Sequence, residues 1–140
     1  MRSLLFHCQK FNASLTGLST RGVDVVPEEI SKSNFDHSEC IVAFITVEEG
    51  DDIVKITPRI AKEIEKFCAD TKEYKIILAP FAHLSNKLAS FKIGISFFEL
   101  LENTLKDKKI YEVDRVHFGS DKDLLIHLFG HPGNARYRQF

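Results

Sequence analysis

The sequence predicts one α/β domain, residues 1–140, in which a mixed β-sheet carries two main helices. Three short runs of apolar and β-branched residues, at 3–8, 40–48 and 74–79, are typical of strands. Two longer stretches place apolar residues three or four positions apart, which is the spacing of a helix that covers a sheet. Because 44% of the 140 residues are apolar, the chain can bury a core without a disulfide or a metal.

The first strand is predicted over "SLLFHC" (3–8) and the next over "CIVAFITVE" (40–48). A structureless connection of roughly thirty residues between them would be unusual in a compact domain. We therefore expect a hairpin within residues 9–39, formed around "ASLTGLS" (13–19) and "VDVVPEE" (23–29).

The first helix is predicted to follow the turn sequence "EEGDD" (48–52). Thr57 offers an N-cap, and Pro58 suits the first helical position because it has no backbone N–H to pair. The apolar side of this helix contains Ile60, Ala61, Ile64, Phe67 and Cys68. After the helix, "YKIILA" (74–79) predicts a buried strand.

The second helix is predicted with Ser85 as its N-cap. Its apolar stripe contains Leu88, Phe91, Ile95, Phe98, Leu101 and Leu105. The basic sequence "LKDKK" (105–109) suits a last helical turn, since the helix dipole favours cations there.

The remaining residues predict a hairpin. "IYEVDRVHF" (110–118) alternates, "GSDKD" (119–123) has turn composition, and "LLIHLF" (124–129) is apolar. "GHPG" (130–133) ends the second strand, and the tail "NARYRQF" (134–140) is interpreted as a cut linker.

Charge and cysteine content exclude several classes of protein. Nineteen basic residues face twenty acidic ones, so broad electrostatic capture of nucleic acid is not expected and any RNA contact must be local. The three cysteines form no C-x-x-C pair, which argues against a disulfide framework and a zinc knuckle. We expect Cys8, Cys40 and Cys68 to be buried thiols in a reducing compartment.

The sequence also predicts a soluble, cytoplasmic protein. The start "MRSLLFH" (1–7) has too short an apolar run for a signal peptide, and no stretch approaches the ~18 apolar residues of a membrane span.

The phosphate-binding patterns G-x-x-x-x-G-K-[ST] and G-x-G-x-x-G and the serine-hydrolase pattern G-x-S-x-G are absent.

Six histidines raise the question of a metal site. His127 and His131 have the spacing that places two ligands on one helical face, but Gly130 and Pro132 make a helix there unfavourable. We therefore expect no metal.

The other histidines have different surroundings. His7 and His117 lie in strand-like runs, where a partly buried, hydrogen-bonded imidazole is expected, and His37 lies in a polar stretch and is expected to be solvated. His83, in "PFAHLS" (80–85), directly follows a strand, and ligands of open α/β sheets gather beyond such strand ends. From its position alone, His83 fits a ligand-binding role and a structural role equally well.

Lys122 also has two interpretations. In the predicted turn it is flanked by Asp121 and Asp123, and a solvated lysine paired with these neighbours is the simpler one. A functional role for Lys122 needs support from outside the local pattern.

Taken in order and spacing, several segments resemble the N-terminal editing domain of archaeal threonyl-tRNA synthetases, across nearly the whole chain. "PFAHLS" combined with the F-G-x-x-K and G-H-P elements makes the resemblance specific. The segments are "MRSLLFH" (1–7), "VAFITVE" (42–48), "PFAHLS" (80–85) with Leu88-Ala89, Phe118-Gly119, Lys122 and "GHP" (130–132).

The resemblance implies a D-aminoacyl-tRNA deacylase-like fold, a homodimer, and hydrolysis of serine wrongly attached to threonine tRNA. Such domains precede the synthetase body or act from a separate chain. The 3′ end of the charged tRNA would enter a pocket built largely from backbone, where the terminal 2′-hydroxyl helps activate the attacking water. No cofactor is implied.

The resemblance also assigns residues. Lys122 matches the family lysine near the scissile ester, and His83 matches the histidine that positions the aminoacyl-adenosine end. An ester in such a pocket needs charge stabilisation and placement more than a strong base. The substrate-binding positions are Val47, Pro80, Ala82, Phe118, Ser120 and Asp121.

The chain departs from the family pattern at two places. Ser120-Asp121 stands where an aromatic pair often precedes the lysine, and Ala135 stands where an acidic residue is expected. The first departure changes the pocket wall, and the second removes a possible partner of Lys122, for which Asp121 or Asp123 offers a replacement. These departures keep open a non-catalytic module for dimerisation or tRNA docking. A second alternative is a D-aminoacyl-tRNA deacylase of the same fold, against which the "PFAHLS" and "GHP" elements argue.

Overall fold

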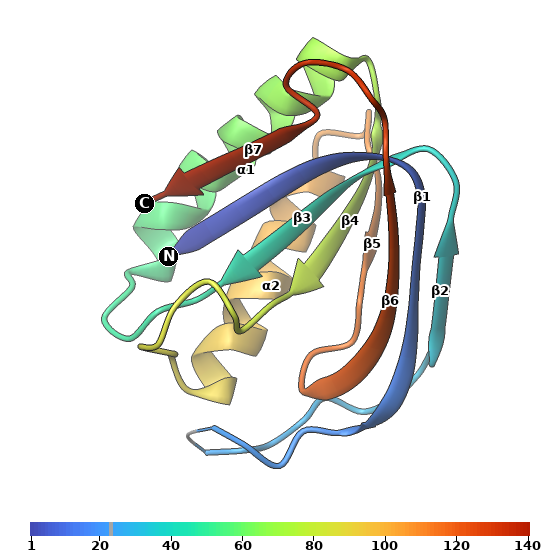
Figure 1. The fold of residues 1–140 in the computed structure, drawn as a ribbon. Coiled ribbons are helices and arrows are strands. Elements are labelled where there is room, and N and C mark those ends of the chain that lie inside the picture. The colour runs from blue at the N-terminus through green and yellow to red at the C-terminus, as the bar shows by residue number, and fades with distance from the viewer. Residues whose placement is uncertain (23) are drawn as a thin grey trace.

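A computed structural model of the chain describes residues 1–22 and 24–140 (Figure 1). It contains a seven-stranded mixed sheet and two long helices, as the sequence predicts. The elements in chain order are β1 (Arg2–Leu18), β2 (Asn34–His37), β3 (Cys40–Thr46), α1 (Ile53–Thr71), β4 (Lys75–Pro80), α2 (Phe91–Lys106), β5 (Glu112–Arg115), β6 (Ser120–Leu128) and β7 (Ala135–Gln139).

Strand β1 organises the sheet because it pairs with four others. Its first half, Arg2–Cys8, lies antiparallel between β3 and β7, and its second half lies antiparallel between β6 and β2. Strands β3, β4 and β5 then continue in parallel, giving the order β2-β1-β3-β4-β5. In Figure 1 the second half of β1 curves away with β6 beside it.

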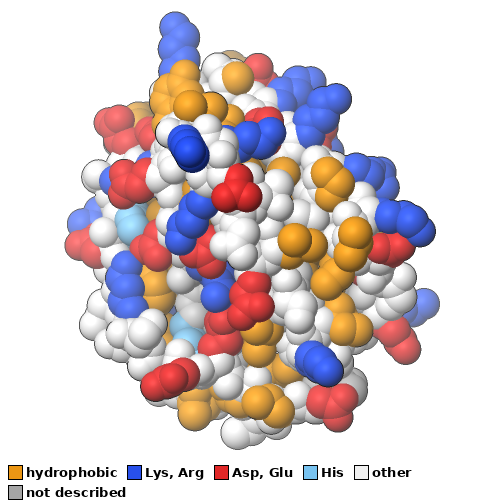
Figure 2. Space-filling model, turned by 180° about the vertical axis from the view of Figure 1, so that it is seen from behind, with side chains coloured by type: hydrophobic (Ala, Val, Ile, Leu, Met, Phe, Trp, Pro, Cys, Tyr) orange, Lys and Arg blue, Asp and Glu red, His pale blue; other side chains and the backbone are white. Residues whose placement is uncertain are grey.

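Both helices cover the same face of the sheet; in Figure 1 α1 lies behind β7, and α2 lies behind β3 and β4. Their buried side chains, including Ile60, Ile64, Phe97 and Leu101, form one apolar core with the sheet. A second core contains Phe11, Phe44 and Ile77, and it is built from strand residues together with Val116, which directly follows β5. Seen from behind, the surface in Figure 2 mixes basic and acidic side chains, as a net charge of −1 suggests.

Helix α1 begins earlier than the sequence predicts. Asp52 is the N-cap, and its Oδ1 accepts from the backbone N–H of Lys55 at 3.2 Å. Thr57 and Pro58 therefore lie inside the helix, and the hydroxyl of Thr57 donates to the carbonyl of Ile53 at 2.6 Å. The carboxylate cap sits at the end of the turn, which lets the helix start one turn before the proline. The predicted apolar side is confirmed, since all five of its residues are buried.

Helix α2 begins later than predicted, because its N-cap is Ser90 rather than Ser85. The Ser90 hydroxyl accepts from the N–H of Ile93 at 3.4 Å. Leu88 consequently lies outside the helix, in an isolated bridge with Glu48. The rest of the stripe is confirmed: Ile95 is half-buried, and the fully buried members are Phe91, Phe98, Leu101 and Leu105.

The predicted hairpin at 110–129 is wrong. Strand β5 adds in parallel to β4, whereas β6 pairs with β1, so the two strands are not partners. Residues 120–123, predicted as a turn, are the start of β6. Alternation of apolar and polar residues identifies a strand but not the strand it pairs with. The long β1 can pair with β6 along most of its length, whereas the short β5 cannot.

Two further expectations are corrected. The tail is no linker, since β7 pairs with Arg2–Phe6 and its Arg136 contacts Asp70 of α1 at 2.8 Å. Within residues 9–39 a hairpin exists, but its strands are the extension of β1 to Leu18 and the short β2. Residues 24–29 form no strand, and Val23 lies outside the described residues. In the described part of the chain, no helix is long and apolar enough to cross a membrane.

Candidate functional site

The candidate site lies beyond the carboxyl ends of the parallel strands. Strands β3, β4 and β5 run in the same direction, so the segments that follow Thr46, Pro80 and Arg115 leave the sheet at one edge. Of the residues that the sequence predicts for substrate binding and catalysis, these segments carry Val47, Ala82, His83 and Phe118. Pro80 ends β4, and the other three, Ser120, Asp121 and Lys122, begin β6.

His83 lies in the connection between β4 and α2 and is exposed. Its ring packs edge-on against Phe81 with 5.0 Å between centroids, and Phe81 packs in the same way against Phe44 of β3. The His83 ring is therefore held by Phe81, which in turn packs on Phe44 of the second core. It also borders a surface hollow of about 410 Å³, lined by Arg2, His83, Leu84, Ser85, Asn86 and Lys87.

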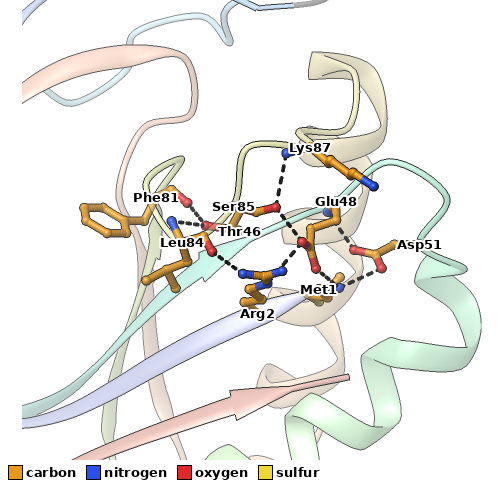
Figure 3. A network of polar contacts seen from close by, with 9 residues as sticks. All are labelled: Met1, Arg2, Thr46, Glu48, Asp51, Phe81, Leu84, Ser85 and Lys87. Carbon is orange, nitrogen blue, oxygen red and sulfur yellow. Dashed lines mark hydrogen bonds and ion pairs between the residues drawn. The ribbon is translucent and has the colours of Figure 1, made fainter.

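Hydrogen bonds between side chains and its backbone hold this connection in place (Figure 3). The hydroxyl of Thr46 donates to the carbonyl of Phe81 and accepts from the N–H of Leu84 at 3.4 Å. The Arg2 Nη1 donates to the carbonyl of Leu84 at 2.9 Å. The segment that carries His83 is thus tied to the ends of β3 and β1.

Glu48 is the centre of the remaining contacts in Figure 3. Its carboxylate accepts from the Ser85 hydroxyl, lies 3.1 Å from the Arg2 Nε, and lies 2.9 Å from the ammonium of Met1. Asp51 also binds that ammonium, at 2.7 Å. The Ser85 hydrogen bond, followed by the Met1 ammonium, holds the pKa of Glu48 below its ordinary value, although burial opposes this.

Lys122 lies on β6 rather than in a turn. Side chains two residues apart share a face of a strand, so Ser120 and Lys122 point to one side and the exposed Asp121 to the other. The Lys122 Nζ donates to the Ser120 carbonyl at 2.6 Å. Burial lowers the pKa of Lys122 to about 8, against the opposing charges of Asp121 and Glu28. Lys122 is therefore a half-buried amine and not the solvated surface lysine of the simpler interpretation.

The other predicted binding residues differ in exposure. Val47 is buried, and its carbonyl accepts from the N–H of Ala89 at 3.0 Å. Pro80 ends β4 beside Ile45, and Ala82 is exposed next to His83.

Phe118 packs behind the start of β6. Its ring contacts Phe91 and Phe98 of α2, at centroid distances of 5.4 and 5.8 Å. Gly94 leaves the space that this ring occupies, because a Cβ at that position would collide with it. Phe118 is therefore fixed by the helix that covers the sheet.

Sequence reasoning missed Glu28. Its carboxylate accepts from the Phe118 N–H at 2.9 Å and from the Arg115 Nη1 at 2.7 Å. Its backbone carbonyl lies 2.9 Å from the His117 Nε2. Glu28 thus links the segment that follows β1 to the β5–β6 connection. No local sequence pattern predicts these contacts, because the partners of Glu28 lie 87 to 90 positions further along the chain.

The other histidines are mostly in structural pairs. His7 is buried, and its Nδ1 lies 2.8 Å from the His131 Nε2; burial, followed by the charge of His131, lowers the pKa of His7. The expectation that His37 is solvated is wrong, because its side chain is only 11% exposed and its Nε2 lies 3.0 Å from the Asp114 carboxylate. Burial lowers the pKa of His37, and Asp114 opposes this shift.

Metal ligands and thiols offer no further site within the described residues. No group of three or more His, Cys, Asp and Glu side chains there is placed to hold a metal ion. The three cysteines are buried and free, as the sequence predicts, and burial raises the pKa of Cys68 to about 12.

Comparison with known proteins identifies the family. The model of the archaea-specific editing domain of threonyl-tRNA synthetase matches residues 1–140. The chain belongs to this family. The resemblance drawn from "PFAHLS", F-G-x-x-K and G-H-P is thereby confirmed.

Named relatives agree. A threonine–tRNA ligase of Staphylothermus marinus is 34% identical over 134 residues, which are 94% of this chain and 21% of the ligase. A threonine–tRNA ligase editing subunit of Saccharolobus solfataricus is 37% identical over 107 residues, covering 76% of this chain and 27% of the subunit. The chain therefore spans about a fifth to a quarter of the length of these relatives.

A solved structure confirms the fold. The c-Myc DNA unwinding element binding protein superposes with a TM-score of 0.70 over 100% of this chain and 99% of its own. At 12% identity this likeness concerns the fold alone. The fold is the mixed α/β sheet with two helices that the sequence predicts.

Proposed function

We propose that this domain hydrolyses the ester of seryl-tRNA(Thr) and so removes serine wrongly attached to threonine tRNA. The observation that carries the proposal is the match of the whole chain to the editing-domain family of threonyl-tRNA synthetase. Two structural features support it: a histidine placed beyond the end of β4, and a half-buried lysine on the strand that follows β5.

Lys122 supplies positive charge to the reacting ester. Attack of water on the carbonyl creates an oxyanion, and a fixed ammonium in a half-buried place stabilises this charge more than a solvated one does. A pKa of about 8 leaves most of the Lys122 amine protonated at neutral pH. The amine is thus a cation when the ester reacts.

His83 positions the substrate. Its exposed ring on the Phe81 support is able to stack on or hydrogen-bond to the terminal adenosine. The 2′-hydroxyl of that adenosine orients the attacking water, while Val47, Pro80, Ala82 and Phe118 line the place of the aminoacyl group. Correct placement of water and ester supplies much of the rate, so no metal or cofactor is needed.

Discrimination against threonine rests on one methyl group. Such a group is worth about 1 to 3 kcal/mol in a pocket that excludes it. Crowding at the β-carbon and displacement of the attacking water both fit, and the test below measures their combined effect.

The partners follow from the same proposal. The domain binds the 3′ end of tRNA(Thr) and works in the cytoplasm with an aminoacylating threonyl-tRNA synthetase module, in the same chain or in a separate one. It acts as a homodimer, for which the exposed apolar residues Leu124, Leu125 and Ile126 on β6 offer a contact.

The decisive experiment compares deacylation of seryl-tRNA(Thr) and threonyl-tRNA(Thr) by the wild type and by Lys122→Ala. We expect fast loss of serine only, and a reduction of at least about 100-fold in the variant, the scale on which oxyanion-stabilising groups act. Lys92→Ala, at an exposed position on α2, is the matched control and keeps the wild-type rate.

Other outcomes separate the alternatives. Hydrolysis of D-aminoacyl esters in preference to the seryl ester would indicate a chirality-checking deacylase. Tight binding of a non-hydrolysable seryl-adenosine mimic without turnover of any ester would indicate a docking module. Full activity of Lys122→Ala together with loss of activity in Asp121→Ala would show that the role of Lys122 is wrongly assigned.

A further inference from the structure

His117 and Ser120 form a hydrogen-bonded pair beside Lys122. The His117 Nδ1 lies 2.9 Å from the Ser120 Oγ, and its Nε2 lies 2.9 Å from the backbone carbonyl of Glu28. Only 6% of His117 is exposed, whereas Ser120 is half-buried. His117 is thus more deeply buried than its serine partner.

The two contacts define which protons the pair holds. A carbonyl oxygen only accepts, so the His117 Nε2 must carry a hydrogen and donate it to Glu28. In the neutral ring Nδ1 is then an acceptor, and the Ser120 hydroxyl donates to it. The result is an ordered chain of serine hydroxyl, imidazole and carbonyl, the arrangement that activates a hydroxyl by giving its proton a receiver.

The serine of this pair lies next to Lys122 on β6. Ser120 and Lys122 share one face of β6, and the Lys122 Nζ donates to the carbonyl of the same Ser120. An ester whose developing oxyanion faces the Lys122 ammonium therefore lies beside the Ser120 hydroxyl.

We infer that Ser120 is a catalytic residue that takes a proton from the attacking water and passes its own proton to His117. This inference rests on the proposed function and names the proton acceptor for the same site. As an O–H bond of the water breaks, its proton moves to the Ser120 Oγ, the serine proton moves to the His117 Nδ1, and the water oxygen bonds to the ester carbonyl carbon. The 2′-hydroxyl of the adenosine keeps its role of orienting the water.

The second half of the reaction returns the proton. The tetrahedral intermediate collapses by breaking the bond to the ribose oxygen, which takes up the proton from His117 through Ser120. Water and ester are consumed and the free amino acid and the free 3′ end are formed, so the imidazole is neutral again after each cycle.

The surroundings of His117 suit a transient positive charge. His117 lines a hollow of about 730 Å³ between the segment after β1, α2 and β5. Acidic groups outnumber basic ones in the lining of this hollow. The Lys122 ammonium contacts the carbonyl of Ser120. Facing this hollow are Glu28, Glu29, Lys32, Glu99, Glu102, Asp114 and Arg115. The carboxylates of this hollow thus place more negative than positive charge around His117.

The test is single-turnover deacylation of seryl-tRNA(Thr) across a pH series by the wild type, Ser120→Ala, His117→Gln and the double variant. His117→Gln keeps an N–H for the Glu28 carbonyl but cannot accept the serine proton. We expect about a 100-fold loss in each single variant, within the usual range for general acid–base catalysis. The double variant should lose no more than either single one, because the two residues act as one unit.

Three readouts distinguish this role from a structural one. The pH dependence of the wild-type rate should change in the same way in both single variants. Binding of the non-hydrolysable seryl-adenosine mimic should stay within about two-fold. Ser14→Ala, at a half-buried serine on the neighbouring β1, should keep the wild-type rate and pH profile.

Each contrary outcome is informative. Wild-type rates in Ser120→Ala, beside an active wild type, would overturn the proton transfer and leave the editing function standing. Multiplying losses in the double variant, or lost binding of the mimic, would show that the residues only shape the pocket and would also overturn it. A wild type that hydrolyses no aminoacyl ester would remove this inference and the proposed function together.

Discussion

At the scale of the residue, Lys122 combines a stability cost with a proposed role. Burial lowers its pKa from 10.5 to about 8, so the folded protein holds an ammonium at neutral pH that water would solvate better. Such a cost is typical of functional sites, where charge is placed for chemistry and not for stability.

We therefore predict that Lys122→Met abolishes deacylation and raises the free energy of unfolding at neutral pH. Between pH values of about 8 and 10.5 the unfolded wild type binds more protons than the folded protein, so wild-type stability rises with pH there. The methionine variant lacks this rise, and its advantage shrinks across that window. Urea unfolding at neutral pH and near pH 10.5 measures both effects.

Lys10→Met is the control for this prediction, because the Lys10 side chain is 53% exposed and pairs with Asp36 on the surface. It should change stability by less than about 0.5 kcal/mol at either pH. A Lys122→Met variant whose stability differs from the wild type by the same amount at both pH values would contradict the buried-cation explanation.

How far single residues were predictable depends on the range of their contacts. The place of His83 beyond a strand end follows from the adjacent apolar run, and the structure confirms that strand. The sequence predicts a turn at Lys122 because aspartates flank it and aspartate is common in turns. In the structure Lys122 lies on β6, and the side chains of the two aspartates point to the face of the strand opposite Lys122. Glu28 and the His117–Ser120 contact depend on tertiary neighbours that no local pattern shows.

At the scale of the element, α2 is shaped to receive Phe118. Alanine is normally better than glycine inside a helix by about 1 kcal/mol. At Gly94 the opposite should hold, because the added Cβ meets the Phe118 ring, which is already packed against Phe91 and Phe98.

We predict that Gly94→Ala destabilises the domain by about 1 to 3 kcal/mol, the usual cost of overpacking. It should also slow deacylation, because Phe118 lies two residues before the start of β6. Thermal or urea unfolding and the seryl-tRNA(Thr) assay measure the two effects. Ser96→Ala, at an exposed position of the same helix, should leave both unchanged. A Gly94→Ala variant of increased stability would show that Phe118 moves freely.

The elements themselves were predicted better than their ends and partners. Apolar spacing identified both helices, since buried faces repeat along the local sequence. The caps were misjudged because Asp52 and Ser90 compete with nearby residues of similar capping ability, Thr57 and Ser85. The partner of β6 was missed because the sequence does not show that β1 continues to Leu18 and leaves an edge for it.

At the scale of the whole molecule, the curved sheet leaves an apolar edge. Within the described residues β6 pairs with β1 alone, and its successive residues Leu124, Leu125 and Ile126 are 41%, 50% and 40% exposed. An unpaired edge strand with exposed apolar side chains readily joins another chain, and natural proteins normally protect such an edge.

We predict that this edge joins two copies of the domain, and that Leu125→Glu shifts the dimer toward monomer by at least about ten-fold in dissociation constant. In a two-fold dimer the same residue of both copies lies at the interface. The substitution would therefore bury two unpaired carboxylates in one interface. Sedimentation equilibrium over a concentration series measures the shift. Val54→Glu, at an exposed apolar residue of α1 away from β6, should leave the association unchanged. A wild type that stays monomeric at all concentrations, or equal effects of the two substitutions, would contradict an interface at β6.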